Sequence, residues 1–177
     1  MHPQLAEYYQ QLQATKEDTL SGLIEIDIEI LQKKPDEKHW SIIQILSHLI
    51  LSEQLSLSYI QKKYPAINEL STVGLKEQLA MKAMKLAQRS SRKFKAPAPV
   101  SQPQNDSSLN EIASDWSKVQ VDLKNFLDAY PEEYFKKALY KHPFIGRISL
   151  SQMIEVHIFH INRHRSQIHH ILRNSKP

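Results

Sequence analysis

The chain has 177 residues, a formal net charge of +4 and no cysteine. The length predicts one domain, residues 1–177, with a substantial core, and the lack of cysteine excludes disulfides and thiolate ligands. We see neither a membrane span nor a secretion signal and therefore expect a cytoplasmic protein with no membrane partner. Only three glycines are present, which argues against a turn-rich β fold and against a glycine-rich phosphate loop.

Residues 5–31 carry apolar side chains at helical spacing, although residues 24–30 alternate between apolar and acidic as a strand would. We predict a helix, because no convincing partner strand or hairpin turn follows. On such a helix Asp27 would lie among leucines and isoleucines. It would then be at a helix edge or held by a partner, since burying a lone carboxylate is costly.

A second helix is predicted by a capping box, in which the Ser41 oxygen accepts a backbone N–H and Gln44 reaches back. We expect this helix to end near Tyr64, because the proline that follows disfavours helical geometry. Residues 75–89 form a shorter predicted helix. Three prolines make residues 95–103 a non-helical crossover, and the crossover to residue 106 could shape a pocket mouth.

Two further helices begin at similar boxes, Ser108 with Glu111 and Ser149 with Gln152. The helix after Ser108 has one apolar stripe without a metal-binding side chain, which we interpret as core. The stripe consists of Leu109, Ile112, Trp116, Val119, Leu123, Phe126 and Leu127. The fold class that follows is all-α, a helical bundle with one long connection and a short extra helix.

The last predicted helix places His157, His160 and His164 within about 60° of one another. His48 lies on an inward-looking row of the helix that Ser41 opens. A lone histidine on an apolar face is usually a satisfied core residue. A pair at i and i+4 can chelate one ion from consecutive turns, however, so histidines supplied by two helices could form a metal cage.

These segments also resemble a known family. Residues 40–49, followed by Glu53, resemble the W-S-x-x-E/Q-x-x-x-H-L element of DinB-like proteins. Residues 160–168 resemble their closing H-x-x-x-H-R-x-Q-I element, and residues 142–146 are similar to an H-P-x-x-G turn that precedes the last helix in one branch. The resemblance to this superfamily, which includes YfiT-like metal hydrolases, spans nearly the whole chain.

The resemblance implies a DinB-like four-helix bundle in which His48, His160 and His164 bind a divalent metal ion. His157 has no counterpart that the family pattern requires, and it could orient a metal ligand or form part of a pocket wall. Zinc or nickel is often found in the family, and members are often homodimers. Some relatives join low-molecular-weight thiols to electrophiles. The implied partners are therefore a small-molecule substrate, such as a thiol, and a second copy of the chain.

Elementary chemistry agrees with this ligand set. Three neutral imidazoles leave at least one coordination position open for water or substrate. Zinc held in this way can lower the pKa of its water to roughly 7, or deprotonate an incoming thiol. Each ligand ring needs an acceptor for its other nitrogen, and Asp27, Glu53 and backbone carbonyls are candidates.

Three other residues could line the site. Ser52 and Tyr59 share the inward row of His48, and Tyr59 could donate a hydrogen bond, although packing alone also explains it. His142 is either a pocket residue or a turn residue before Pro143. No zincin motif is present, because neither histidine pair on the last helix encloses the glutamate that serves as general base.

Two classes of function stay open from the sequence. One is a metal-dependent enzyme, either hydrolytic or thiol-transferring. The other is a non-catalytic bundle that binds a metal or a small ligand. Nucleic-acid binding through the basic run at residues 89–95 is a weaker idea, because a solvated helix end explains those charges equally well.

Overall fold

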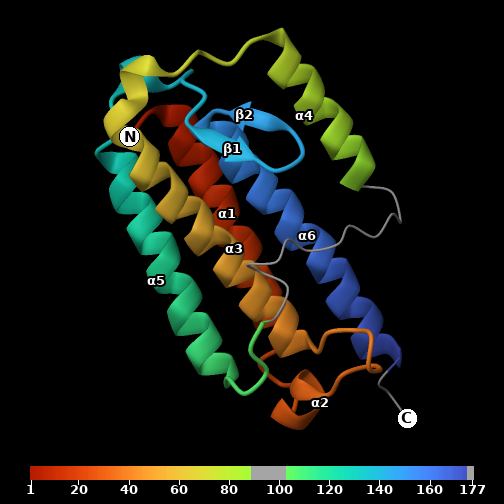
Figure 1. The fold of residues 1–177 in the computed structure, drawn as a ribbon. Coiled ribbons are helices and arrows are strands. Elements are labelled where there is room, and N and C mark those ends of the chain that lie inside the picture. Colours follow the sequence, from red (N-terminus) through yellow and green to blue (C-terminus); the bar gives the residue numbers. More distant parts are fainter. Residues whose placement is uncertain (89–102, 175–177) are drawn as a thin grey trace.

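The computed structural model describes residues 1–88 and 103–174, and four long helices dominate it (Figure 1). They are α1 (Pro3–Ser21), α3 (Ile42–Lys63), α5 (Leu109–Asp128) and α6 (Leu150–Asn174). Each contacts two of the others: α1 packs on α6, α6 on α3, α3 on α5, and α5 on α1. The four helices therefore form a closed bundle in which α3 and α6 are neighbours. The prediction of an all-α four-helix bundle is confirmed.

The direction of the helices explains the long connection. In Figure 1, α1 and α6 run the same way, whereas α3 and α5 run the opposite way. The end of α3 and the start of α5 consequently lie at opposite ends of the bundle. The intervening chain must cross its full length, and it includes the 3₁₀ helix η1 (Tyr64–Glu69) and α4 (Leu75–Gln88), which packs outside the bundle on α6.

The capping boxes position the helices as predicted. The Ser41 side chain accepts the Gln44 N–H at 3.1 Å, and the Gln44 side chain accepts the Ser41 N–H at 3.2 Å. The same exchange opens α5 at Ser108 and α6 at Ser149.

The prediction that the helix after Ser41 ends near Tyr64 is confirmed. The helix predicted for residues 75–89 is confirmed as α4 up to residue 88. Residues 89–102, with the basic run and most of the crossover, lie outside the described residues.

The prediction of one helix over residues 5–31 is wrong. α1 ends at Ser21, residues 22–26 form turns, and the short α2 (Ile28–Gln32) begins after Asp27. The break lets Leu23 and Leu31 enter the core while Ile24 stays 66% exposed. The alternating stretch is therefore neither a strand nor a continuation of α1.

A β-hairpin precedes α6, where only a turn was expected. β1 (Tyr140–His142) pairs antiparallel with β2 (Gly146–Ile148), and His142 lies opposite Gly146. Gly146 has a φ of 87°, a conformation that favours glycine. β1 contacts both α3 and α6, so the hairpin packs against these two neighbouring helices.

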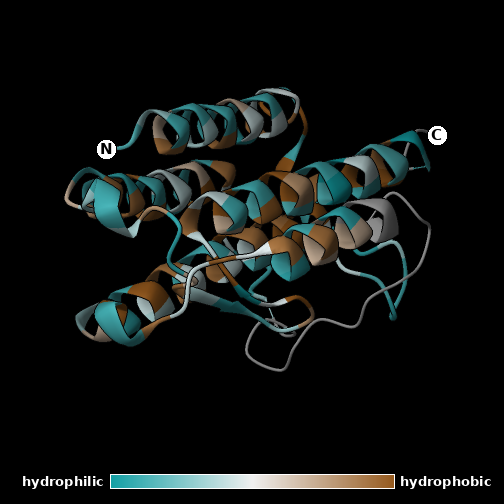
Figure 2. Cartoon of the chain, turned by 90° about the horizontal axis from the view of Figure 1, so that it is seen from above, coloured by the Kyte–Doolittle hydropathy of each residue, from teal (hydrophilic) through white to brown (hydrophobic). Residues whose placement is uncertain are grey.

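The core lies between the four long helices, each of which has hydrophobic and hydrophilic faces (Figure 2). The stripe predicted on α5 is confirmed: Trp116 and Leu127 are fully buried, and Leu109 and Phe126 pack at its edges. Within the described ranges, every helix is too short or too polar to span a bilayer.

One carboxylate is buried in this core. Glu53 on α3 accepts hydrogen bonds from the Trp116 indole at 2.9 Å and from the Gln120 amide at 3.3 Å, which joins α3 to α5. Burial raises the pKa of Glu53 to about 7, although both hydrogen bonds and the nearby Lys16 lower it. A carboxyl group whose pKa is higher in the folded protein stabilises the fold less as the pH rises.

We predict that Glu53→Gln changes the pH dependence of stability. Between pH 4.5 and 7 the folded wild type holds a proton at Glu53 that the unfolded chain has lost. The free energy of unfolding of the variant, measured against wild type by urea denaturation, should therefore rise by about 3 kcal/mol across this range. The buried histidines change the free energy of unfolding of both proteins equally, so their contribution cancels in the difference between variant and wild type. The exposed variant Glu7→Gln serves as control, and a parallel pH profile for Glu53→Gln would contradict the prediction.

Candidate metal centre

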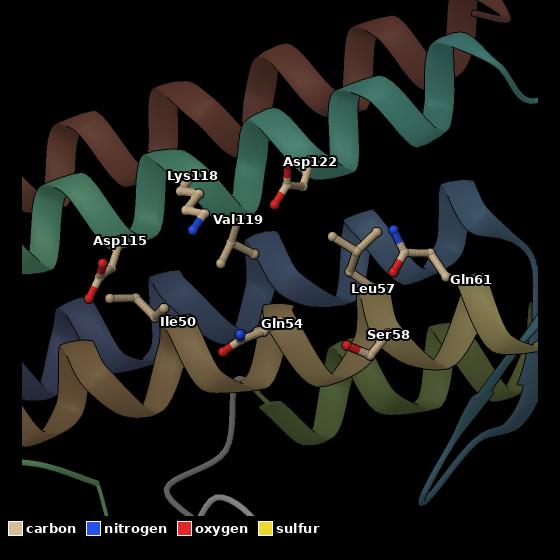
Figure 3. Close-up of a pocket in the computed structure, with 9 residues that line it drawn as sticks. All are labelled: Ile50, Gln54, Leu57, Ser58, Gln61, Asp115, Lys118, Val119 and Asp122. Carbon is tan, nitrogen blue, oxygen red and sulfur yellow. The ribbon is translucent and has the colours of Figure 1, made fainter.

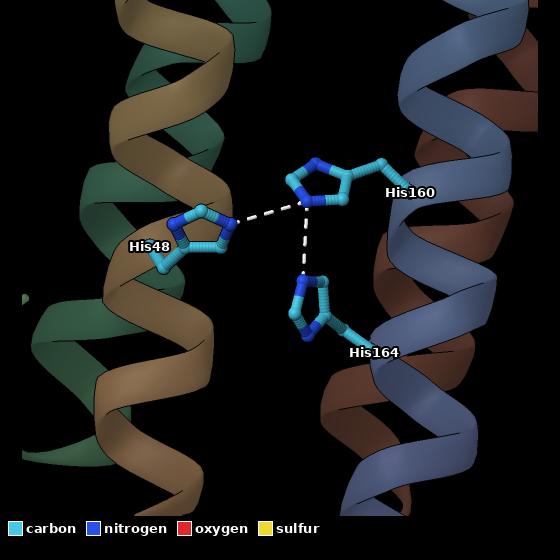
Figure 4. A group of neighbouring side chains, drawn as sticks. All are labelled: His48, His160 and His164. Atoms are coloured by element: carbon cyan, nitrogen blue, oxygen red, sulfur yellow. Dashed lines mark hydrogen bonds between the residues drawn. The ribbon is translucent and has the colours of Figure 1, made fainter. Parts of the chain in front are cut away.

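Three imidazoles meet between α3 and α6 (Figure 4). His160 and His164 project from consecutive turns of one face of α6, and His48 reaches them from α3. His48 is buried with its ring 4.9 Å from that of Trp40, whereas His160 and His164 are partly buried. The side chains point toward one another across 112 residues of sequence.

Two of the three separations between ring nitrogens are close to those around a tetrahedrally coordinated cation. The His160 Nε2 lies 3.1 Å from the Nε2 of His48 and 3.1 Å from that of His164. One nitrogen from each of the three rings lies within 4.8 Å of the others. Imidazole nitrogens bound to zinc at about 2.0–2.1 Å in tetrahedral geometry would be about 3.3 Å apart. The donor set therefore fits a divalent metal ion.

Hydrogen bonding alone does not account for this arrangement. A neutral ring nitrogen carries either one proton or one lone pair. The His160 Nε2 faces two nitrogens, so at most one of its two contacts can be a linear hydrogen bond, and the other is a close contact without one. A cation between the three rings would replace these contacts by attraction, because it accepts all three lone pairs.

Gln167 fixes the tautomer of one ring. Its Oε1 accepts a hydrogen bond from the His164 Nδ1 at 3.0 Å, which leaves the Nε2 lone pair directed at the other rings. The sequence analysis gave Gln167 no role, although it belongs to the closing element at residues 160–168. The signal was available, because a residue three positions after a ligand on a helix lies on the same face.

The site keeps its histidines neutral. Burial, followed by the neighbouring His48 ring, lowers the pKa of His164 to about 4. The pKa of His160 lies well below its usual value, again chiefly because of burial. Both rings are therefore unprotonated at pH 7, which is the form that binds a cation.

The two carboxylates proposed as partners of the ligand rings lie elsewhere. Asp27 is exposed at the N-cap of α2, and both Glu53 oxygens accept hydrogen bonds from α5. Neither belongs to the three-histidine group. The geometry therefore supports Gln167, and not Asp27 or Glu53, as an acceptor that orients a ligand.

Four other candidates border the site. Ser52 donates to the His48 carbonyl at 2.8 Å, and Tyr59 packs edge-on against Tyr140 with ring centres 5.6 Å apart. His142 is buried at the end of β1, and His157 is buried one turn before His160. Burial lowers the pKa of both histidines to about 4.

A groove of about 330 Å³ lies on another side of α3 (Figure 3). Its walls are residues of α3 and α5, and they include Gln54 and Ser58 opposite Asp115, Lys118 and Asp122. None of the three clustered histidines lines it. The chemistry that imidazoles can supply therefore lies on the α6 side of α3.

Comparison with known proteins agrees with the architecture and with the histidine pattern. A family model for the DinB superfamily matches residues 11–168. The chain belongs to the DinB superfamily. The resemblance seen in the sequence is thereby confirmed over most of the chain.

Two Bacillus subtilis proteins are similar to this DinB protein. Uncharacterized protein YuaE of strain 168 is 25% identical over 154 residues, which covers 87% of this chain and 90% of YuaE. The solved structure of YfiT, described as a probable metal-dependent hydrolase with an unusual four-helix bundle topology, matches with a TM-score of 0.57. That match covers 98% of this chain and 89% of YfiT at 14% identity, so it shows a shared fold.

We predict that Gln167→Leu weakens metal binding. Removing the acceptor frees His164 to rotate and to adopt the other tautomer, so zinc affinity should fall about 10–100-fold. Competition against a chromophoric chelator at pH 7 measures the loss. Ser166→Ala, an exposed change at the adjacent position of α6, is the matched control. A Gln167→Leu affinity equal to that of the control would show that the hydrogen bond does not support the site.

Proposed function

We propose that this DinB-superfamily protein is a metal-dependent enzyme that activates a small nucleophile, either water or a low-molecular-weight thiol. The observation that supports the proposal is the convergence of the His48, His160 and His164 Nε2 atoms within one coordination sphere. The proposed reaction is hydrolysis or thiol transfer on a small-molecule substrate. The description of YfiT as a probable metal-dependent hydrolase supports the hydrolytic form.

The donor set suits a catalytic ion. A divalent ion, with zinc or nickel as the proposed occupants, supplies a Lewis acid that increases the acidity of a bound water or thiol. The chain contributes neutral rings only, and no carboxylate belongs to the group. The full charge of the ion therefore remains available to an incoming anion or nucleophile, and three protein ligands leave a fourth position for it.

Neighbouring residues of the chain orient and shield the ligand rings in this scheme. Gln167 holds His164 with its lone pair toward the ion. Trp40 packs against the His48 ring and helps exclude water from that side. The low pKa of His164 means that the ion does not have to displace a proton at neutral pH.

The second candidate is a non-catalytic bundle that holds a metal or a small ligand. The burial of His48 favours it, since a structural ion is enclosed by protein. The two candidates differ in what metal removal does: a structural ion holds the fold together, whereas a catalytic ion can leave a folded protein behind.

Homodimer formation, a cytoplasmic location and a single domain over residues 1–177 stay predictions. Sedimentation velocity at several protein concentrations tests the first of them. A sedimentation coefficient of a 20.6 kDa monomer at every concentration would contradict the dimer.

We predict that His160→Ala abolishes metal retention, because His160 occupies the centre of the cluster and its loss leaves only two rings. Protein dialysed against excess zinc and then against buffer should hold about one equivalent as wild type and less than about 0.1 as the variant. His169→Ala removes an exposed histidine from the same helix and should retain the wild-type amount. A His160→Ala protein with one equivalent of zinc would refute the ligand assignment.

We also predict that the protein stays folded after chelation. The four helices bury their apolar faces against one another without help from the ion. Treatment with a strong chelator should leave the helical circular dichroism unchanged, and added zinc should raise the melting temperature of wild type and not of His160→Ala. Unfolding on chelation would favour the structural candidate.

A further inference from the structure

A second pair of buried histidines lies beside the proposed metal centre. His142 ends β1, and His157 precedes His160 by one turn of α6. The two rings are close enough for a charge on one to oppose a charge on the other, and both also act on His160. β1 contacts both α3 and α6, which are the two helices that carry the three-histidine cluster.

The hairpin fixes the tautomer of His142. Its Nδ1 accepts the backbone N–H groups of Phe144 at 3.2 Å and Ile145 at 3.3 Å. A neutral ring that accepts at Nδ1 carries its proton at Nε2. His142 therefore presents a neutral N–H donor whose position is set by the backbone of the β1–β2 turn.

His157 has the opposite feature, a polar atom that the fold does not satisfy. Its side chain is only 6% exposed, and its Nε2 is buried without a hydrogen-bond partner among residues 1–88 and 103–174. Buried polar atoms are nearly always satisfied, and an orphan costs free energy that an apolar side chain would avoid. An orphan next to a proposed ligand of the metal is a position at which a bound ligand would complete the hydrogen bonding.

We propose that His142 and His157 form a subsite that binds an acceptor oxygen of a small carboxylate substrate whose reacting end reaches the metal centre. In this scheme the His142 Nε2–H donates one hydrogen bond to the oxygen, and the neutral His157 ring carries its proton at Nε2 and donates a second. An anionic ligand is favoured over a neutral one because the neighbouring cation carries a charge that no carboxylate of its group offsets.

The wall beside the pair is also polar. The hydroxyls of Ser56 and Tyr140 lie 2.9 Å apart, and the Tyr140 ring lies 6.4 Å from that of His142. This inference rests on the proposed function, since it requires a cation at His48, His160 and His164.

Cobalt(II) makes the subsite measurable without a known substrate. Protein loaded with cobalt is titrated with acetate, and its visible spectrum reports the binding. Azide, which binds cobalt and lacks a carboxylate, serves as the control ligand. Cobalt uptake by itself tests the metal centre, so a failure of the proposed function is distinguished from a failure of the subsite.

Two variants remove the donors with little change in shape. His157→Phe keeps an aromatic ring on the same Cβ but removes both ring nitrogens. His142→Asn replaces the imidazole with a side chain whose oxygen can still accept the backbone N–H of the turn. Each should bind cobalt and azide as wild type does and should lose about tenfold or more in acetate affinity. His170→Phe, at an exposed position of α6, should change nothing.

Several results would overturn the inference. Acetate affinity equal to wild type in both variants, or an equal loss of acetate and azide affinity, would show that the pair does not recognise a carboxylate. Wild-type protein that binds cobalt and azide but not acetate would do the same. If His157→Phe fails to fold by circular dichroism, His142→Asn decides alone. If wild type takes up no cobalt, the metal centre fails and the subsite fails with it.

Discussion

The packing of α3 on α6 is the constraint on which the candidate site depends. His48 and His160 are 112 residues apart in sequence, yet their Nε2 atoms lie 3.1 Å apart. A helix turns by about 100° per residue, so a shift of one residue in α3 would direct His48 away from α6. The helix start is held by the Ser41–Gln44 box, and its middle is tied to α5 through Glu53 and Trp116. These contacts make the position of His48 a property of the whole bundle.

The polar groups of the interior fall on two sides of α3. The side toward α5 carries Glu53, whose two oxygens accept hydrogen bonds from Trp116 and Gln120, while the Gln120 Oε1 is itself buried without a partner among the described residues. The side toward α6 carries the clustered imidazoles, in which the His160 Nε2 faces two other ring nitrogens. Hydrogen-bonded buried groups stabilise and specify a fold, whereas several neutral nitrogen donors that converge on one point suit a cation. The distribution of the donor groups supports a structural role for the Glu53 contacts and places the candidate chemistry on the α6 side of α3.

Local chemistry made much of this predictable. The three capping boxes and the apolar stripe of α5 gave the starts of three helices and one buried face, since both features depend on residues within a few turns. Predicting the histidine cluster required the family resemblance in addition to the residue spacing. Spacing placed His160 and His164 together, and the likeness to DinB proteins linked them to His48.

The missed features depend on tertiary context. The break after Ser21 could not be read from residues 5–31, because their helical periodicity continues through it and only core packing of Leu23 and Leu31 distinguishes the two forms. The β1–β2 hairpin is three residues on each side and is held by contacts with α3 and α6. Glu53 and Asp27 were only candidates for partners of the ligand rings, because a sequence does not give the direction of a side chain around a buried helix.

The order of the helices has a consequence for how the protein matures. One ring of the cluster belongs to the first third of the chain, and the other two belong to its last helix. A ribosome must therefore add at least 112 residues after His48 before the three imidazoles can meet. Loading of an ion at this position follows the docking of α6 and cannot guide the folding steps that precede it.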